Sequence, residues 1–221
     1  MNKGKIIVLE GLDGCGKSTQ LELIVKVLAE RGLTVRLVSF PNYESHSGKI
    51  IKDYLGGKIP CEGKVGAYSA SSFYAADRYI SFNTDWKQYY DNGEIIVCGR
   101  YTTSNAIYQM TKLSENERDE FLSWLWDYEY EKLGLPKPDK VLYLDMPIEV
   151  SQKLLSARYK GDETKKDIHE RNLDFMRNCH NSALYTAEKC GWDMISCSDG
   201  NEPFSIEHIH KQILESIKEL L

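Results

Sequence analysis

Gly11-Leu12-Asp13-Gly14-Cys15-Gly16-Lys17-Ser18 is the most informative segment of this 221-residue chain, because it matches the phosphate-binding pattern GxxxxGK(S/T). An unbroken apolar run, KIIVL at residues 5–9, precedes it, and a pattern of helical period opens at Ser18. A strand, then a glycine-rich turn, then a helix is the order that this pattern requires. The segment therefore predicts a P-loop that binds a nucleoside triphosphate, the alternative being a glycine-rich turn that matches by chance.

Each residue type in the loop has a physical task. Glycines let successive backbone N–H groups turn towards phosphate oxygens without a Cβ in the way, and the start of the helix adds its positive dipole end. Lys17 can reach the transferred phosphate, and the Ser18 hydroxyl can ligate Mg²⁺. The predicted ATP phosphate-binding residues are Gly11, Gly14, Cys15, Gly16, Lys17, Ser18 and Thr19.

Short apolar runs alternate with longer segments of helical period along the rest of the chain. The predicted strands are residues 5–9, 34–39, 94–98, 140–144 and 193–197, and such unbroken runs are typical of strands covered on both faces. The predicted helices are residues 18–30, 48–55, 68–90, 103–112, 115–132, 147–159, 168–190 and 204–221. This alternation predicts an α/β fold, a doubly wound five-stranded parallel sheet flanked by helices, in a single domain over residues 1–221.

Composition excludes several classes of protein. With 42% hydrophobic and 28% charged residues the chain is neither disordered nor fibrous, and its net charge of −5 argues against a nucleic-acid-binding protein. The six cysteines show no CxxC pair or metal-site spacing, and no segment has the form of a signal peptide or a membrane-spanning helix. We therefore expect a reduced, cytoplasmic protein with no nucleic-acid or membrane partner.

Motifs outside the loop narrow the class further. No NKxD-type guanine motif is present, which disfavours a GTPase. The other informative segments are Phe40-Pro41-Asn42-Tyr43, Phe73-Tyr74-Ala75-Ala76-Asp77-Arg78, residues 100–109 (RYTTSNAIYQ), residues 135–139 (LPKPD) and residues 143–145 (YLD). Together with the P-loop they make the chain resemble the thymidylate kinase family almost from end to end. The resemblance implies a P-loop kinase with a mobile lid, which transfers the terminal phosphoryl group of ATP to dTMP.

The resemblance also implies an acceptor site. Phe73 would stack on thymine, and Arg78 would donate to a ring carbonyl. Asn105 would read the neighbouring ring N–H with help from Ser104, and Tyr108 would exclude a ribose 2′-hydroxyl. The predicted dTMP-binding residues are Asp13, Phe40, Pro41, Tyr43, Phe73, Arg78, Arg100, Ser104, Asn105 and Tyr108. Structural alternatives remain open: a core Phe73, a surface ion pair for Arg78, and helix caps for Ser104 and Asn105.

Phosphoryl transfer needs cations that hold both substrates. Arg100 is the candidate for the acceptor phosphate, because a guanidinium binds phosphate bidentately. By the resemblance, Asp13 contacts the sugar 3′-hydroxyl, although an aspartate here can also form a turn. The charged segment 158–167 is predicted to be a lid over ATP, or simply a solvated loop. The predicted lid cations are Arg158, Lys160, Lys165 and Lys166, and the predicted catalytic residues are Lys17, Arg100, Arg158 and Asp13.

The chain departs from the family pattern at two places. The family usually has an aspartate immediately before the arginine at Arg100, where this chain has Gly99. Mg²⁺ would then be held by Ser18, with Asp13 or Glu10 as a further ligand. The segment after Pro41 also lacks the arginine that the family often contributes to the acceptor phosphate, although Lys49 follows closely.

On this resemblance we expect a homodimeric thymidylate kinase that uses ATP and Mg²⁺ and serves dTTP synthesis. A related P-loop kinase that acts on deoxynucleosides or on another nucleoside monophosphate is the alternative. A third hypothesis is a non-catalytic nucleotide-binding protein, because this chain has Gly99 where the family usually has an aspartate.

Overall fold

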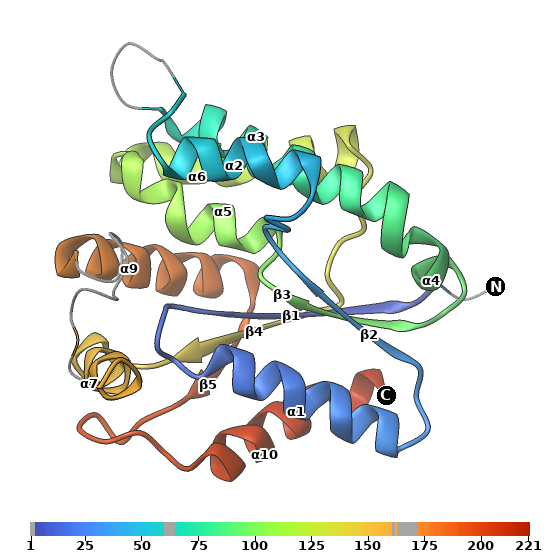
Figure 1. Cartoon of the computed structure of the whole chain (residues 1–221), viewed down its shortest axis with the longest axis vertical. Helices are drawn as coiled ribbons and strands as arrows, with labels where there is room; N and C mark the ends of the chain where they lie inside the picture. The colour runs from blue at the N-terminus through green and yellow to red at the C-terminus, as the bar shows by residue number, and fades with distance from the viewer. Residues whose placement is uncertain (1–2, 60–64, 161, 163–171) are drawn as a thin grey trace.

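A five-stranded parallel sheet forms the centre of the molecule (Figure 1). The computed structural model describes residues 3–59, 65–160, 162 and 172–221. The strands are β1 (Lys5–Gly11), β2 (Val35–Ser39), β3 (Ile95–Gly99), β4 (Lys140–Asp145) and β5 (Asp193–Ser196), in the order β2-β3-β1-β4-β5. Every neighbouring pair runs parallel. The predicted sheet is confirmed strand for strand.

Helices cover both faces of the sheet (Figure 1). On one side lie α1 (Lys17–Glu30) and α10 (Ile206–Ile217), and on the other lie α3 (Ala67–Ser81), α5 (Thr102–Tyr108), α6 (Arg118–Trp126) and α9 (Leu173–Cys190). α2 (His46–Leu55) packs on α3, α4 (Lys87–Asp91) precedes β3, and α7 (Ile148–Arg158) follows β4. Among the described residues, no helix is long and apolar enough to cross a bilayer.

Two of the long predicted helices are interrupted by π-helical turns. The segment predicted as residues 68–90 consists of α3, the π-helical segment η1 (Phe82–Trp86) and α4. The segment predicted as residues 115–132 consists of a 3₁₀ turn η3 (Glu115–Glu117), α6 and the π-helical segment η4 (Asp127–Lys132). Further 3₁₀ turns are η2 (Met110–Lys112) and η6 (Lys218–Leu220). Such turns often mark functional sites, and η4 carries the buried carboxylate of Glu129.

Alternate strand residues fill the core on both faces of the sheet. On β1, Ile7 and Leu9 pack in the cluster that includes α1 and α10, whereas Ile6 and Val8 pack in the cluster on the opposite face. All four side chains are fully buried. This double coverage is the reason why the strands read as unbroken apolar runs in the sequence.

The carboxyl ends of β1 and β3 lie next to each other, with Leu9 paired to Gly99. β1 leads into the P-loop at Gly11, and β3 leads into Arg100. In open α/β sheets, ligands bind at this edge, where the strand order reverses. The fold therefore brings together two sequence motifs that are almost ninety residues apart.

Candidate active site

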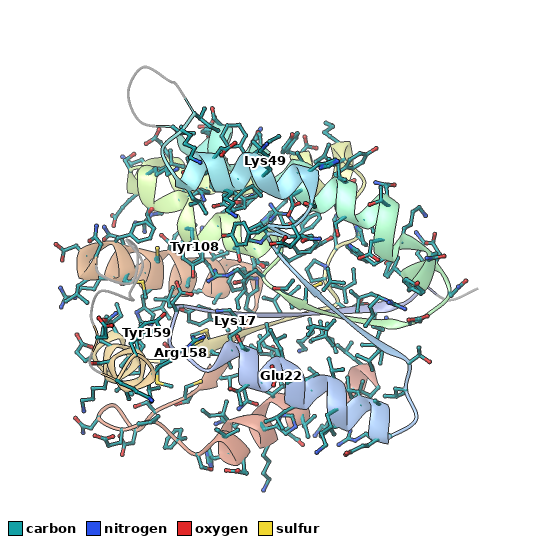
Figure 2. All side chains as sticks on the ribbon, viewed as in Figure 1. Lys17, Glu22, Lys49, Tyr108, Arg158 and Tyr159 are labelled. Atoms are coloured by element: carbon teal, nitrogen blue, oxygen red, sulfur yellow. The ribbon has the colours of Figure 1, made fainter. Side chains whose placement is uncertain are left out.

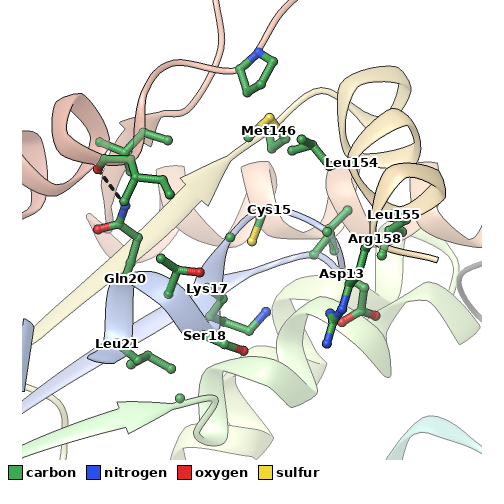
Figure 3. A pocket seen from close by; sticks show the side chains of 18 of the residues that line it. Asp13, Cys15, Lys17, Ser18, Gln20, Leu21, Met146, Leu154, Leu155 and Arg158 are labelled. Carbon is green, nitrogen blue, oxygen red and sulfur yellow. Dashed lines mark hydrogen bonds between the residues drawn. The ribbon is translucent and has the colours of Figure 1, made fainter. Parts of the chain in front are cut away.

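The P-loop forms one wall of a cavity of about 700 Å³, hereafter the donor cavity. Residues 12–19 line it from the P-loop and the start of α1, and Ser39 and Gly99 line it from the ends of β2 and β3. The opposite wall is apolar and is made by Met146, Leu154, Leu155, Pro203 and Phe204. Figure 3 shows this cavity between the P-loop and α7. Its size suits a nucleotide.

Backbone geometry in the P-loop favours an anion. Gly14 and Gly16 have φ values of 82° and 85°, in the left-handed region that glycine tolerates. A Cβ at Gly14 would also come within 2.8 Å of the Ser151 carbonyl oxygen. α1 starts directly after Gly16 and has no acidic residue in its first turn, so nothing on that turn offsets its positive end.

The P-loop side chains Lys17 and Ser18 line the donor cavity, and their tasks at the phosphates and at Mg²⁺ stay predictions. Lys17 donates from Nζ to the carbonyl oxygen of Gly11 at 2.8 Å, and Ser18 is exposed at the cavity. Gly11 is buried and does not line the cavity, so its part is to hold Lys17. Burial raises the pKa of the Cys15 thiol, so this residue stays a neutral thiol and contributes packing and its backbone N–H.

A second cavity of about 320 Å³, hereafter the acceptor cavity, lies against the first. Most of the predicted acceptor residues line it: Asp13, Phe40, Pro41, Tyr43, Arg78, Arg100, Ser104, Asn105 and Tyr108. Asp13 and Arg100 line both cavities. The two spaces therefore meet at one pair of side chains, beside the P-loop.

The pair at this junction is held tightly. Arg100 donates from Nη2 to Oδ1 of Asp13 at 2.9 Å, and its guanidinium carbon lies 4.7 Å from the ring centre of Tyr108. Burial acts to lower the pKa of Arg100, but Tyr108, Asp13 and Glu10 outweigh it and raise that pKa well above its usual value. Arg100 also has a φ of 71°, which is unusual for a residue with a side chain. Strained, charged residues of this kind cluster at functional sites.

The prediction that Phe73 forms the aromatic wall of the acceptor cavity is wrong. Phe73 does not line the cavity and packs against Tyr54 with ring centres 5.6 Å apart, whereas Tyr74 does line it. Helix geometry explains the difference, because residues four apart share a helix face and residues five apart do not. Tyr74 is four residues before Arg78, and Phe73 is five.

Arg78 and Asn105 line the acceptor cavity as predicted, and none of the alternatives for them holds. Arg78 is only 1% exposed, and it pairs with Glu129 rather than forming a surface ion pair. α5 begins at Thr102 with Tyr101 as its N-cap, so Ser104 and Asn105 lie inside the helix and do not cap it.

Glu10, which we predicted as a metal ligand, faces α5 instead. It is fully buried and lines neither cavity. Its Oε1 atom accepts hydrogen bonds from the backbone N–H of Tyr101 and from the hydroxyls of Thr103 and Ser104, at 3.2, 2.7 and 2.7 Å. Oε1 thus satisfies the start of α5, while the buried Oε2 has no hydrogen-bond partner among the described residues. Because Glu10 reaches neither cavity, this geometry gives a role as metal ligand no support.

The lid prediction is tested only at its first residues, because residues 161 and 163–171 lie outside the described part of the chain, Lys165 and Lys166 among them. Arg158, the last residue of α7, lines the donor cavity and extends towards the side where Asp13 lies (Figure 3). Lys160 is exposed and does not line either cavity. Lys49 is likewise exposed on α2, away from Lys17 (Figure 2), and does not replace the missing arginine of the family pattern.

At Gly99 another residue fills the space that a side chain at this position would take. A Cβ added there would lie 2.6 Å from Cδ1 of Leu21 and 3.4 Å from Oγ of Ser39. Leu21 is buried and lines the donor cavity. A methyl group of Leu21 therefore occupies the space that an aspartate at position 99 would need.

Gly99→Asp is expected to retain activity, to shift the Mg²⁺ dependence and to lower stability by about 1–3 kcal/mol, because Leu21 must move to admit the new side chain. The checks are a thermal melt and a titration of the initial rate with Mg²⁺. Adding Leu21→Ala removes the contact that opposes the new side chain, and the shifted Mg²⁺ dependence should persist in the double variant. An unchanged Mg²⁺ titration in the double variant would exclude position 99 from the neighbourhood of the metal.

Several residues of the site escaped the sequence reasoning. Asp77 is buried and accepts from the backbone N–H of Asn42 and the hydroxyls of Ser45 and Ser47, at 3.0, 3.2 and 2.6 Å, and so holds the loop after Pro41 against α3. Gln109, Lys112 and Phe175 complete the acceptor cavity, and Pro203 and Phe204 complete the donor cavity. Only the spacing of Tyr74 from Arg78 gave a usable signal in the sequence.

Comparisons with known proteins agree with this geometry. A family model described as thymidylate kinase matches residues 9–213. The chain is 34% identical over 171 residues to a thymidylate kinase of Plasmodium falciparum, with 76% of this chain and 75% of that protein covered. It is 29% identical over 217 residues to a probable thymidylate kinase of Pyrococcus horikoshii, with 98% and 97% covered. A solved structure of thymidylate kinase from Candida albicans shares the fold, with a TM-score of 0.72 at 21% identity over 99% of this chain and 92% of that one.

Proposed function

Since this chain belongs to the thymidylate kinase family and is an ATP-dependent dTMP kinase, we propose that it joins its two substrates at the junction between the donor and acceptor cavities. The family resemblance read from the sequence is confirmed. The observation that carries the proposal is the pair Asp13–Arg100, which lines both cavities. A phosphoryl group passing from one cavity to the other has to pass this pair.

Positioning and charge neutralisation provide most of the catalysis of phosphoryl transfer. The P-loop N–H groups and Lys17 bind the phosphates of ATP, and Lys17 leaves the Gly11 carbonyl for the transferred group. Arg100 binds the phosphate of dTMP with its fork of N–H donors, and Asp13 both orients Arg100 and accepts from the sugar 3′-hydroxyl.

Mg²⁺ suits the oxygen atoms at this junction. Ser18 and Asp13 line the donor cavity and would hold the ion, and no larger cluster of metal-binding side chains occurs among the described residues. Mg²⁺ commonly takes one or two protein oxygens and leaves its other positions to phosphates and water. When bound, it neutralises charge on the phosphates.

The acceptor cavity supports recognition of a deoxypyrimidine. Tyr74 supplies an aromatic face, while Arg78 and Asn105 supply polar groups for the ring edge. Tyr108 lies under Arg100, and burial raises the pKa of its hydroxyl well above the usual value, so a neutral ring bounds the sugar end of the cavity. A ribose hydroxyl would have to enter against that ring.

We further propose that the segment from Arg158 onward closes over ATP, which would exclude water from the reacting phosphate.

A homodimer is supported by apolar side chains that are exposed on two neighbouring helices. These are Ile50 of α2 and Tyr79 and Ile80 of α3. The enzyme would act as a single domain in the cytoplasm, in the synthesis of dTTP.

One assay tests the function against its alternatives. ADP formation from ATP is measured with dTMP, dUMP, dGMP or thymidine as acceptor, with and without Mg²⁺. We expect the highest kcat/KM for dTMP and none for thymidine, because thymidine has no phosphate for Arg100 to bind. A preference for thymidine or for dGMP would establish the related P-loop kinase instead, and an absence of ADP with every acceptor would establish a non-catalytic binding protein.

A further inference from the structure

Glu129 lies at the centre of a buried network behind the acceptor cavity. Its side chain is fully buried, and it does not line the cavity itself. Oε1 accepts from Nη2 of Arg78 at 2.6 Å and from Nδ2 of Asn105 at 3.0 Å. Oε2 accepts from Nε of Arg78 at 2.6 Å and from Oγ1 of Thr102 at 2.9 Å. All four acceptor positions of the carboxylate are therefore used within the protein.

The network connects three separate parts of the chain. Glu129 belongs to η4, Arg78 to α3, and Thr102 and Asn105 to α5. Burial acts to lower the pKa of Arg78, but the charge and hydrogen bonds of Glu129 outweigh it and raise that pKa. Buried charges persist only where they are paired and hydrogen-bonded in this way. The pair therefore fixes the guanidinium, and only one hydrogen on each Nη atom is left, since Nη1 also donates to the Tyr101 carbonyl at 3.3 Å.

The orientation of the Asn105 amide follows from the same network. Nδ2 donates to Oε1 of Glu129 at 3.0 Å and to the carbonyl oxygen of Ser71 at 3.2 Å, so both of its hydrogens are used. A flipped amide would set Oδ1 against these two acceptor oxygens with no proton between them. Within the described residues Oδ1 has no hydrogen-bond partner, and Asn105 lines the acceptor cavity, so Oδ1 is the atom left for a ligand.

At the base end of the cavity, Arg78 thus offers a hydrogen-bond donor, and Oδ1 of Asn105 offers an acceptor beside it. Thymine and uracil offer the complement, with a carbonyl oxygen at ring position 4 and an N–H at position 3. Cytosine offers the reverse, with an amino group at position 4 and an unprotonated nitrogen at position 3. An acceptor atom held towards ring position 3 would therefore attract thymine or uracil and repel cytosine.

We propose that Glu129 is a positioning residue that locks the Asn105 amide with Oδ1 towards the acceptor cavity, and thereby sets the preference for pyrimidines with an N–H at position 3 over cytosine. The inference rests on the roles proposed above for Arg78 and Asn105 at the base. Glu129 does not touch the substrate and acts through both residues.

Glu129→Gln tests this, because it replaces one acceptor oxygen by a donor and so removes one of the two acceptors that hold the amide, leaving only the Ser71 carbonyl. Glu131→Gln is the matched control, since Glu131 lies two residues away in η4, is 57% exposed and pairs only with Lys137 among the contacts described. For each protein, kcat/KM is measured with dTMP, and the inhibition constant of dCMP is measured against dTMP. In Glu129→Gln we expect the preference for dTMP over dCMP to fall by about 10- to 100-fold, and in Glu131→Gln to stay unchanged.

A loss of activity with both nucleotides affected equally would mean a structural role alone and would overturn the proposal. Should Glu129→Gln fail to fold, exchange of the Asn105 side-chain amide protons, followed by NMR in the wild-type protein, decides the matter. Slow exchange supports a locked amide, and exchange at the rate of a free asparagine overturns it. A wild-type enzyme that forms no ADP with dTMP would instead refute the proposed function itself, so the two failures are distinguishable.

Discussion

Arg100→Ala is expected to lower kcat/KM for dTMP by about 10³-fold, the lower end of what a phosphate-binding arginine contributes to phosphoryl transfer. Arg100 lines both cavities and is held there by Asp13 at 2.9 Å. Without its guanidinium, the acceptor phosphate loses the fork of donors that would orient it for in-line transfer. The affinity for ATP should change by less than about threefold, because the P-loop N–H groups and Lys17 remain.

Steady-state kinetics with dTMP and calorimetric titration with ATP measure the two effects separately. Arg100→Lys is the informative companion, because lysine keeps the charge but lacks the planar fork, and we expect it to recover only part of the loss. The backbone strain at this position is not a confounding factor, since alanine and lysine meet the same φ of 71° as arginine does. Normal turnover of dTMP by Arg100→Ala would exclude this residue from the reacting centre.

Lys17→Ala is expected to lower kcat by about 10²- to 10³-fold at saturating ATP and dTMP, the range measured when one preorganised donor to a developing charge is removed. Nζ of Lys17 lies 2.8 Å from the Gly11 carbonyl, so the ammonium is held over the P-loop. Among the described residues, no other lysine lines the donor cavity, and no other lysine enters either cavity from the P-loop.

The same helix offers a control for Lys17. Lys26 is exposed on α1 and makes a surface ion pair with Glu30 at 3.9 Å, which contributes little. Lys26→Ala should therefore leave kcat within about twofold of the wild type. If Lys17→Ala behaved like Lys26→Ala, the P-loop lysine would have no part in the transfer.

Local rules were sufficient for the sheet and for the P-loop. The strands could be identified because both faces of the sheet are covered, so each strand is a run of apolar residues. The P-loop could be identified because its spacing and its place between a strand and a helix repeat in many proteins. The interruptions of the two long helices could not be predicted, since nothing in the local sequence distinguishes the π-helical segments η1 and η4 from continuous α-helix.

At the acceptor site, motif matching placed the right segment but the wrong aromatic residue. Choosing between Phe73 and Tyr74 depended on the angle between side chains on α3, and a count of residues to Arg78 would have selected Tyr74. Glu10 was also misassigned, because its position beside the P-loop suggested a metal ligand, whereas packing against α5 gives its carboxylate three hydrogen-bond donors.

By itself, the sequence determined the fold class, the family and the phosphate-binding loop, because each was recognised from motifs whose own residues are near one another along the chain. Only the tertiary structure decided which side chains share a wall: that Asp13 and Arg100 join the two cavities, that Leu21 fills the space beside Gly99, and that Glu129 orients Asn105. Glu129 lies in the charged stretch DYEYEK, which reads as a solvated surface until the fold buries it. The physical reason is that hydrogen bonds and burial depend on distances in space, and the packing of α3, α5 and η4 sets those distances.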